Sequence, residues 1–313
     1  MEPLVIVAGP TATGKSKTGI ELALRMGGSI ISADSMQVYR HMDIGTAKVT
    51  PGQMRGVPHA LIDIIEPGEE WNVVRFQELS KKAVSEALMQ GRLPILVGGT
   101  GFYIQALLYD IDFTKTREDG AFREQMQAIA RREGPQALHE RLALVDPQAA
   151  KAIHPNNVKR VIRALEYARE TGEPISSHNE EQRKRPPAYD AVFFVLTMER
   201  RRLYERINRR VDRMLEDGLV EEVRALKERG LGAGDVCMQG LGYRQILSYL
   251  EGTVSLEDAT AQIKTQTRHF AKRQLTWFQG QKDVIWLSVD SFGSAQEVAA
   301  EMERIIREKQ AAV

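Results

Sequence analysis

The residues best suited to chemistry lie near the start of the chain, in a glycine-rich segment. Residues 9–16 read GPTATGKS and match the pattern G-x-x-x-x-G-K-[ST] at every position. Such a loop directs successive backbone amides at an anion, and the helix that follows adds partial positive charge. We therefore expect a phosphate site, the alternative being a chance glycine-rich turn. In this phosphate site, Lys15 adds a full positive charge and the Ser16 hydroxyl is the expected Mg²⁺ contact. The expected phosphate-binding residues are Gly9, Pro10, Thr11, Ala12, Thr13, Gly14, Lys15 and Ser16.

The usual partner of a hydrolytic phosphate loop, an apolar strand that ends in aspartate, is not evident. The strongest apolar run, residues 93–97, is followed by Gly-Gly-Thr-Gly, and residues 60–65 carry Asp63 inside the run rather than at its end. This pattern favours a loop that binds a phosphate group while a different atom reacts.

Two further strand ends carry polar residues. Asp34, Ser35 and Gln37 follow the apolar run 29–33, and Thr100 follows the run 93–97. Because the carboxyl ends of parallel strands face the ligand crevice, these side chains are expected beside the phosphate loop. Asp34 is suited to accept a proton from a nucleophile, although a helix N-cap explains its position equally well. Thr100 stands between glycines and could mark only a tight turn.

The elements that must position these residues alternate between strands and helices. Short apolar runs at residues 4–8, 60–65 and 93–97 predict buried strands, and the short segment 29–33 is expected to be a further strand. Residues 15–26 and 73–90 have helical spacing. This alternation predicts an α/β fold with a P-loop and a doubly wound parallel sheet.

The alternation stops near residue 112. Residues 118–182 show no convincing strand, and helices are expected at about 120–133, 135–144 and 156–171. A polar, proline-rich linker is expected at 176–190. Strands return at 191–198 and 283–289, with helices at about 199–217, 219–229, 239–250, 255–278 and 294–310. We therefore predict a core (1–114 and 190–313) interrupted by an all-helical insertion domain (115–189).

Composition sets limits on environment. The chain has 313 residues, a net charge of +1 and one cysteine, Cys237, which excludes a disulfide framework and indicates a reducing compartment. The first ten residues contain an apolar run too short for a signal peptide or a membrane span. We expect a cytoplasmic protein without a membrane partner.

Positive charge is concentrated in two stretches. Basic residues outnumber acidic ones in 151–210, and 259–282 contain basic residues and no acidic one. Helical spacing places Arg206, Arg210 and Arg213 on one face. It places Lys264, Arg268 and Lys272 on another, beside Arg273. Surface ion pairs are the alternative, with Glu199 and Glu216 in sequence reach of the first face and no acid in reach of the second. We favour a polyanion site.

The motifs together resemble one family. In chain order they are GPTATGKS, ISADSMQVYRHMDIGTAK, PHALID, LVGGTGFY, IHPNNVKRVIRALE, GYRQ and RHFAKRQLTWF. This set closely resembles the bacterial tRNA dimethylallyltransferases and spans about residues 4–290. The resemblance implies transfer of a dimethylallyl group from dimethylallyl diphosphate to the exocyclic N6 amine of the adenine adjacent to the anticodon (tRNA position 37), with Mg²⁺ assisting. Bond breaking is then at carbon, and the phosphate loop holds the departing diphosphate.

The resemblance also implies roles for individual residues. The adenine-recognition segment matches Asp34, Ser35, Met36 and Gln37, with Asp34 as the base. Thr100 matches a tRNA-contacting position and is expected to be catalytic together with Asp34. The resemblance places further tRNA contacts at Arg123, Lys159, Arg160, Val161, Ile162 and Arg163. From the basic faces, and not from the resemblance, we expect Arg210 at the diphosphate and Arg268, Lys272 and Arg273 at tRNA. We expect a monomer.

Three other functions remain open from the residues. The same phosphate loop would serve a small-molecule kinase that uses ATP. Prenyl transfer to free adenine nucleotides would use the same site without tRNA, although the basic helical insertion argues against it. A pure RNA-binding module would leave the phosphate loop unused.

Overall fold

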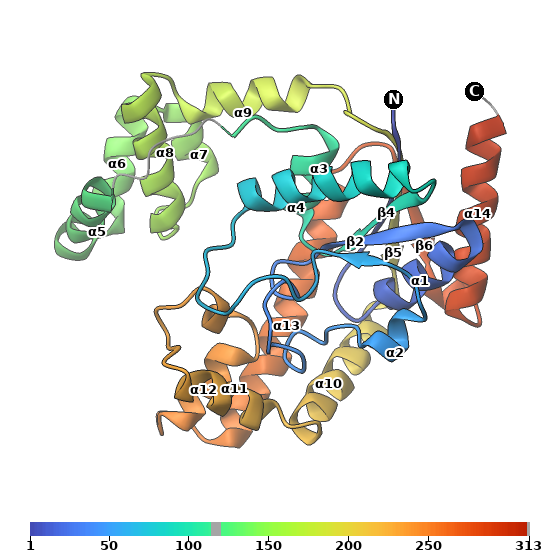
Figure 1. Ribbon diagram of the computed structural model, residues 1–313. Coiled ribbons are helices and arrows are strands. Elements are labelled where there is room, and N and C mark those ends of the chain that lie inside the picture. Colours follow the sequence, from blue (N-terminus) through green and yellow to red (C-terminus); the bar gives the residue numbers. More distant parts are fainter. Residues whose placement is uncertain (114–119, 312–313) are drawn as a thin grey trace. The chain divides into compact units, whose positions relative to one another are not determined.

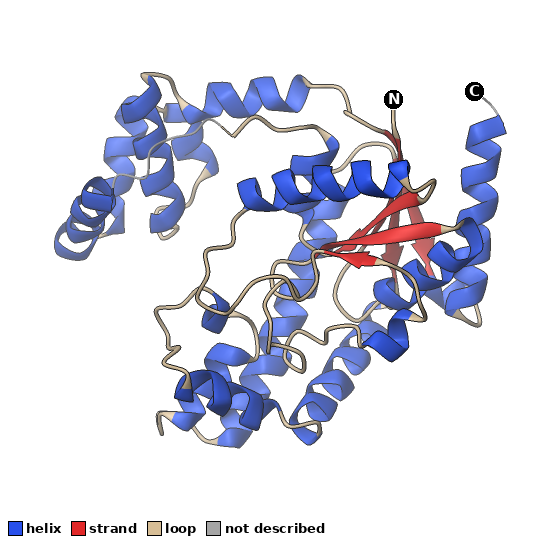
Figure 2. Ribbon diagram, viewed as in Figure 1, coloured by secondary structure: helices blue, strands red, loops and turns tan. Residues whose placement is uncertain are grey.

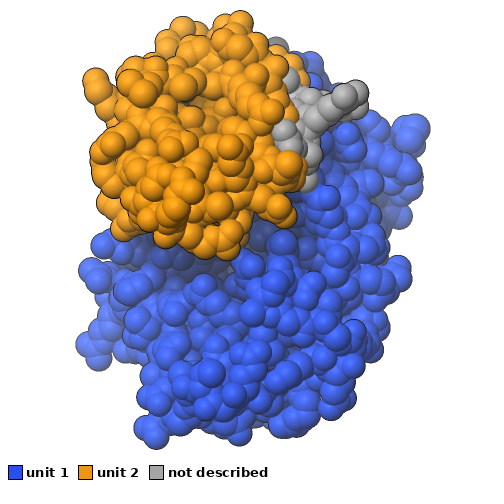
Figure 3. Space-filling view, turned by 90° about the vertical axis from the view of Figure 1, so that its left-hand side faces the viewer, with its two compact units in different colours: residues 1–110, 187–313 blue, residues 111–186 orange. Residues whose placement is uncertain are grey.

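The computed structural model describes residues 1–113 and 120–311 (Figure 1). It divides into two compact units (Figure 3): residues 1–110 with 187–313, and residues 111–186. Within the described residues, no helix combines the length and apolar character needed to cross a membrane.

The first unit is built on a six-stranded sheet in the order β3-β2-β4-β1-β5-β6, in which every pair of neighbours is parallel (Figure 2). This confirms the predicted α/β class with a parallel sheet. The strands are β1 (Pro3–Ala8), β2 (Gly28–Ala33), β3 (His59–Ala60), β4 (Leu93–Gly98), β5 (Asp190–Thr197) and β6 (Val284–Ser288).

Alternate residues of the central strand enter two separate hydrophobic cores. Leu4 and Ile6 of β1 belong to the larger core, and Val5 and Val7 to the other. The smaller core is closed by α1 (Lys15–Met26) and α14 (Ala295–Ala311), and the larger by α3 (Val73–Met89), α4 (Gly101–Leu108) and α13 (Leu256–Gln279). Because helices cover both faces, β1, β4 and β5 are largely continuous apolar runs, which is why the sequence revealed them.

Three more helices complete the carboxyl-terminal half of this unit. They are α10 (Arg200–Glu216), α11 (Leu219–Glu228) and α12 (Tyr243–Leu250), which pack together beside α13 (Figure 1). A short helix α2 (Pro51–Met54) lies in the loop after β2. The second unit contains α5 (Gly120–Glu133), α6 (Pro135–Val145), α7 (Pro147–Ala152), α8 (Val158–Thr171) and α9 (Ile175–Lys184) around its own apolar cluster.

Two expectations about local structure were wrong. The strand expected at 60–65 ends at Ala60, because Leu61 and Asp63 adopt left-handed backbone with φ of 63° and 62°. Thr100, for which a tight turn was the alternative, is the N-cap residue of α4, which packs against β4 and α3. The expected linker at 176–190 contains α9, which is capped by Pro174 and ends before Pro186.

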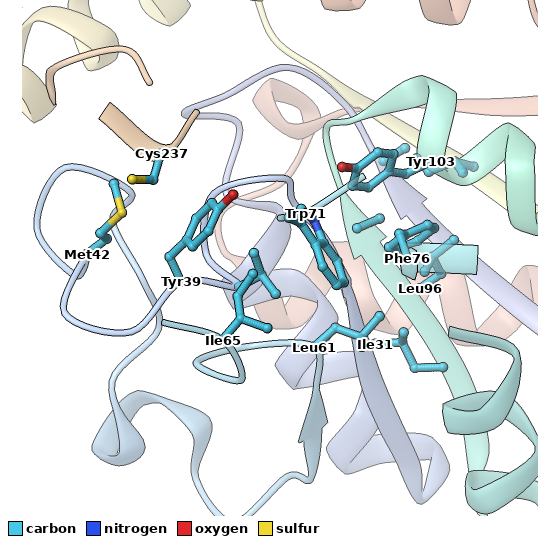
Figure 4. Close-up of a cluster of buried hydrophobic side chains, with 14 of the residues drawn as sticks. Ile31, Tyr39, Met42, Leu61, Ile65, Trp71, Phe76, Leu96, Tyr103 and Cys237 are labelled. Carbon is cyan, nitrogen blue, oxygen red and sulfur yellow. The ribbon is translucent and has the colours of Figure 1, made fainter. Parts of the chain in front are cut away.

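The long loop after β2 is ordered by burial rather than by regular structure. Tyr39, Met42 and Ile65 pack with Trp71 and Cys237 in the larger core (Figure 4). This packing explains the left-handed residues of the expected strand, because they turn the chain so that its apolar side chains reach the core.

Candidate active site

A cavity of about 1110 Å³ opens at the carboxyl ends of β1, β2 and β4. Residues that follow these three strands line it, together with side chains of α10 and α13. The phosphate loop, the 34–37 segment and Thr100 therefore share one cavity, as the parallel topology requires. All of its walls belong to the first unit.

The phosphate loop is shaped by backbone that only glycine tolerates at two points. Gly9 has a φ of 141°, and a Cβ there would lie 2.4 Å from the Leu196 carbonyl oxygen. Gly14, at a φ of 94°, caps α1 without a side-chain hydrogen bond, so the helix N-terminus is left open to an anion. Thr13 closes the loop through a 2.8 Å hydrogen bond from Oγ1 to the Pro10 carbonyl.

Lys15 lies inside the loop, where Nζ donates a 2.7 Å hydrogen bond to the Pro10 carbonyl. Burial lowers its pKa from 10.5 to about 7, against the raising effect of the Asp34 carboxylate and with a further lowering by Arg210. A bound anion would supply this buried amine with a counterion and would favour its ammonium form.

Asp34 caps a turn rather than the helix considered for it from the sequence, because residues 34–50 contain no helix. Its Oδ1 accepts hydrogen bonds from the backbone amides of Met36, at 2.9 Å, and Gln37, at 3.3 Å, so it caps the turn. Its negative charge also acts on Lys15 and on Arg210, which places the carboxylate among the cations of the cavity.

Arg210 reaches the cavity from α10, and its Nη2 donates to the Thr46 carbonyl at 3.4 Å. Burial lowers its pKa, Asp34 opposes that shift, and the neighbouring Arg206 adds to it. Arg206 and Arg213 line the same cavity, so the face predicted from their spacing is directed at the phosphate loop.

The remaining residues of the 34–37 segment and Thr100 also line the cavity. Gln37 is buried, and its Nε2 donates to the carbonyls of Thr46, at 3.2 Å, and Ala47, at 3.3 Å. Thr100 sits at the N-terminus of α4, where its backbone amide donates to the Ala33 carbonyl at 3.3 Å.

Sequence reasoning missed Gln274 of α13. Its Oε1 accepts from the Thr11 amide at 2.9 Å, and its Nε2 donates to the Gly99 carbonyl at 2.9 Å, so it links the phosphate loop to the end of β4. A Cβ on Gly99 would lie 2.3 Å from that Nε2, which explains the glycine. The sequence could have indicated Gln274, because it is a polar residue on the same helix face as the apolar residues Ala271 and Phe278.

The second basic face differs from its prediction. Lys264 has an acidic partner after all, because its Nζ lies 2.5 Å from Asp212 Oδ1 on α10. Arg268 donates to Asn208 Oδ1 at 2.7 Å. Lys272 and Arg273 are exposed, and Arg273 lines the cavity. The acid that pairs with this face was supplied by another helix, which a count of sequence neighbours cannot detect.

The residues of the second unit that were expected to contact tRNA fall into three groups. Val161 and Ile162 are 0% and 4% exposed within its apolar cluster, so their side chains are inaccessible to a partner and that expectation is corrected. Arg123 and Arg163 both bond to the buried Glu166. Lys159 and Arg160 are exposed near the start of α8, where they can meet a ligand.

The donors in the cavity suit Mg²⁺ shared with a ligand. Among the described residues, no group of three His, Cys, Asp or Glu side chains forms a metal site. Ser16 and Asp34 nevertheless bring a hydroxyl and a carboxylate to the same cavity. Mg²⁺ is commonly held by one or two such oxygens and by phosphate oxygens, so these residues fit it.

The family model described as IPP transferase matches residues 37–281, and that described as Isopentenyl transferase matches residues 2–65. The chain belongs to the IPP transferase family. Family membership makes it a prenyl-transferring enzyme. Among its relatives, a protein of Lachnoclostridium phytofermentans named tRNA dimethylallyltransferase is 56% identical over 310 residues, which cover 99% of each chain. One of Geobacillus kaustophilus with the same name is 49% identical, covering 98% of this chain and 96% of that one.

Solved structures of the family have the same fold. A tRNA isopentenylpyrophosphate transferase of Bacillus halodurans matches with a TM-score of 0.75 at 44% identity, covering 100% of this chain and 99% of that one. A eukaryotic dimethylallyltransferase acting on tRNA matches with a TM-score of 0.82 at 31% identity, covering 98% of this chain and 80% of that one.

Proposed function

We propose that the protein transfers a dimethylallyl group from dimethylallyl diphosphate to the N6 amine of adenine 37 in tRNA. The observation that carries this proposal is the meeting of Lys15, Arg210 and Asp34 in one cavity with the phosphate loop. The cations suit a departing diphosphate, and the carboxylate suits the proton of the attacking amine. The names of the relatives support the same reaction.

The diphosphate is assigned to the segment from Gly9 to Ser16, which we identify as a P-loop, and to Arg210. When the bond to the allylic carbon breaks, negative charge develops on the diphosphate oxygen. The open N-terminus of α1, the Lys15 ammonium and the Arg210 guanidinium are preorganised to stabilise that charge. Binding of the anion also favours protonation of Lys15.

Asp34 is assigned as the base. An adenine N6 amine is a weak nucleophile until its proton has an acceptor, and the Asp34 carboxylate lies in the cavity to accept it. The adenine must leave its stack to reach this site. The cavity around Asp34 is also lined by Ser35, Met36, Gln37 and Thr100. We assign these residues to binding of the adenine.

Mg²⁺ is assigned to the Ser16 hydroxyl and the diphosphate oxygens. When bound there, the ion supplies positive charge that stabilises the leaving group.

Binding of the tRNA backbone is assigned to helices α5 to α9, which we regard as an insertion in the P-loop core, and to exposed basic residues of α13. Lys159 and Arg160 contribute charges from the insertion, and Lys272 and Arg273 from α13. Arg123, Arg163 and Arg268 would join them only by exchanging or sharing their present partners. We place the protein in the cytoplasm as a monomer.

The deciding experiment is mass spectrometry of unmodified tRNA after incubation with the protein, Mg²⁺ and dimethylallyl diphosphate. The expected product carries one added dimethylallyl group on adenine 37. Matched reactions replace tRNA with AMP, or the prenyl donor with labelled ATP and candidate small-molecule acceptors. Prenylated AMP with unchanged tRNA, or label transfer from ATP, would contradict the proposal.

A further inference from the structure

A carboxylate outside the cavity holds one of the loops that form the cavity wall. Glu222 lies on α11, and its Oε2 accepts hydrogen bonds from the backbone amides of Asp43, at 2.8 Å, and Ile44, at 2.7 Å. Its Oε1 accepts from the amide of Gly45 at 3.0 Å and from the hydroxyl of Tyr243 at 2.6 Å. Three consecutive amides and a phenol therefore converge on one side chain.

Tyr243 completes this contact from α12. Burial, and then the charge of Glu222, raise the pKa of Tyr243 far above its usual range, so the hydroxyl remains protonated and donates. The ring also packs against Gly45, where a Cβ would lie 2.5 Å from the ring atoms. Glu222 and Tyr243 thus fix the loop from two neighbouring helices.

The same loop then positions two side chains of the cavity. The Thr46 carbonyl accepts from Arg210 Nη2 at 3.4 Å and from Gln37 Nε2 at 3.2 Å, and the Ala47 carbonyl also accepts from Gln37. Arg210 comes from α10 and Gln37 from the segment after β2. These carbonyls connect the two side chains, so the placement of both depends on where the loop is held.

Further hydrogen bonds of the loop are made within the segment that follows β2. Lys48 bonds to Asp43 at 2.6 Å and to Asp63 at 2.7 Å, and Thr46 Oγ1 donates to the Met42 carbonyl at 2.6 Å. These bonds shape the loop. Glu222 connects it to α11, which packs against α12 and against α10, the helix that carries Arg210.

We propose that Glu222 is a positioning residue for prenyl transfer, which holds residues 43–47 so that Arg210 faces the departing diphosphate. This inference rests on the proposed role of Arg210. Glu222 lies outside the lining of the cavity and acts through the loop.

The test uses Glu222→Gln, which keeps the shape of the side chain. The amide of glutamine keeps one acceptor oxygen. In place of the second carboxylate oxygen it has an NH₂ group, which cannot accept the hydrogen bonds that this oxygen accepted. Glu221→Gln is the matched control, because Glu221 is exposed on the same helix, where it pairs with Arg224. We expect kcat per active site to fall about 10- to 100-fold in Glu222→Gln, with the KM for tRNA within about threefold, and no change in the control.

A double-mutant cycle separates positioning from general structural support. In an Arg210→Lys background, Glu222→Gln should lower kcat by less than about a further threefold, because the contact of Arg210 with the departing diphosphate is already lost. Losses that multiply, or an unchanged kcat in the single variant, would overturn the proposal. If Glu222→Gln fails to fold, Tyr243→Phe replaces it in the same double-mutant cycle. We expect a smaller loss of kcat from Tyr243→Phe alone, and again less than about threefold additional loss in the Arg210→Lys background.

Binding of inorganic pyrophosphate, measured by calorimetry without tRNA, provides an independent readout. Glu222→Gln should weaken it and Glu221→Gln should not. A wild-type protein that fails to modify tRNA contradicts the proposed function, whereas equal pyrophosphate affinity in wild type and Glu222→Gln contradicts the role of Glu222.

Discussion

Gln274 accepts a hydrogen bond from the backbone amide of Thr11 at 2.9 Å, across 263 residues of sequence. Its other amide atom donates to the Gly99 carbonyl, so one side chain sets the spacing between the phosphate loop and the end of β4. The Thr11 amide is thereby occupied, which leaves the later amides of the loop and the N-terminus of α1 for the anion.

Gln274→Glu is expected to weaken pyrophosphate binding by about tenfold or more. A glutamate still accepts from Thr11, but it cannot donate to Gly99 and places a negative charge beside the anion site. Calorimetric titration with pyrophosphate measures the effect. Gln262→Glu, at an exposed position of the same helix, is the control for added charge. Equal affinities in the two variants would show that Gln274 does not shape the site.

Lys15 should make anion binding depend on pH. Its pKa of about 7 in the free protein means that the amine is largely neutral above that pH, whereas a bound anion favours the ammonium form. Binding then takes up a proton, so affinity should be constant below about pH 7 and fall toward tenfold per pH unit above it.

Pyrophosphate affinity is measured between about pH 6 and pH 9 for wild type and for Lys15→Met. Protonation of pyrophosphate affects both proteins equally, so it cancels when the wild-type affinity is divided by that of the variant. This ratio should decline above about pH 7. A ratio that stays flat across this range would mean that Lys15 remains charged in the free protein.

Asp34→Asn should separate the two roles of this residue. The Asn side chain keeps an oxygen that can accept from the amides of Met36 and Gln37, but it cannot accept the proton of the amine. We expect kcat to fall by about 10²- to 10⁴-fold, with pyrophosphate binding retained. Asp34→Ala should also lose about 1 kcal/mol of stability, because the turn loses its cap. An active Asn variant would refute the assignment as base.

The exposed basic pair at the start of α8 should contribute to tRNA affinity through charge alone. Replacing Lys159 and Arg160 with glutamine is expected to weaken tRNA binding and to reduce the slope of log K against log salt by about one for each phosphate that these side chains neutralise. Binding measured at several salt concentrations gives this slope. An unchanged slope would place both charges in solvent.

Arg123 provides the contrast, because its side chain supports the second unit itself. It binds both oxygens of Glu166, which is 1% exposed. Arg123→Gln should therefore lower the melting temperature, since it leaves part of a buried charge without its partner. A melting temperature equal to that of wild type would show that Arg163 alone satisfies Glu166.

Local patterns determined the parts of this protein whose partners are near in sequence or repeat regularly. The glycine-rich loop at residues 9–16 could be predicted because its glycines, lysine and hydroxyl lie within eight consecutive residues, and β1 and β4 because strands buried on both faces are mostly apolar. The parallel order expected from this alternation also predicted that Asp34 and Thr100 lie beside the loop.

Tertiary structure decided what depends on contacts between distant segments. Gln274 and Glu222 bond to backbone groups far along the chain, and a polar side chain in a helix shows nothing in its own neighbourhood of such a partner. Packing against the core set the left-handed turn at Leu61, and another helix supplied the acid for Lys264. Backbone propensity and side-chain periodicity are local properties, whereas the positions of these groups result from burial and hydrogen bonding across the whole first unit.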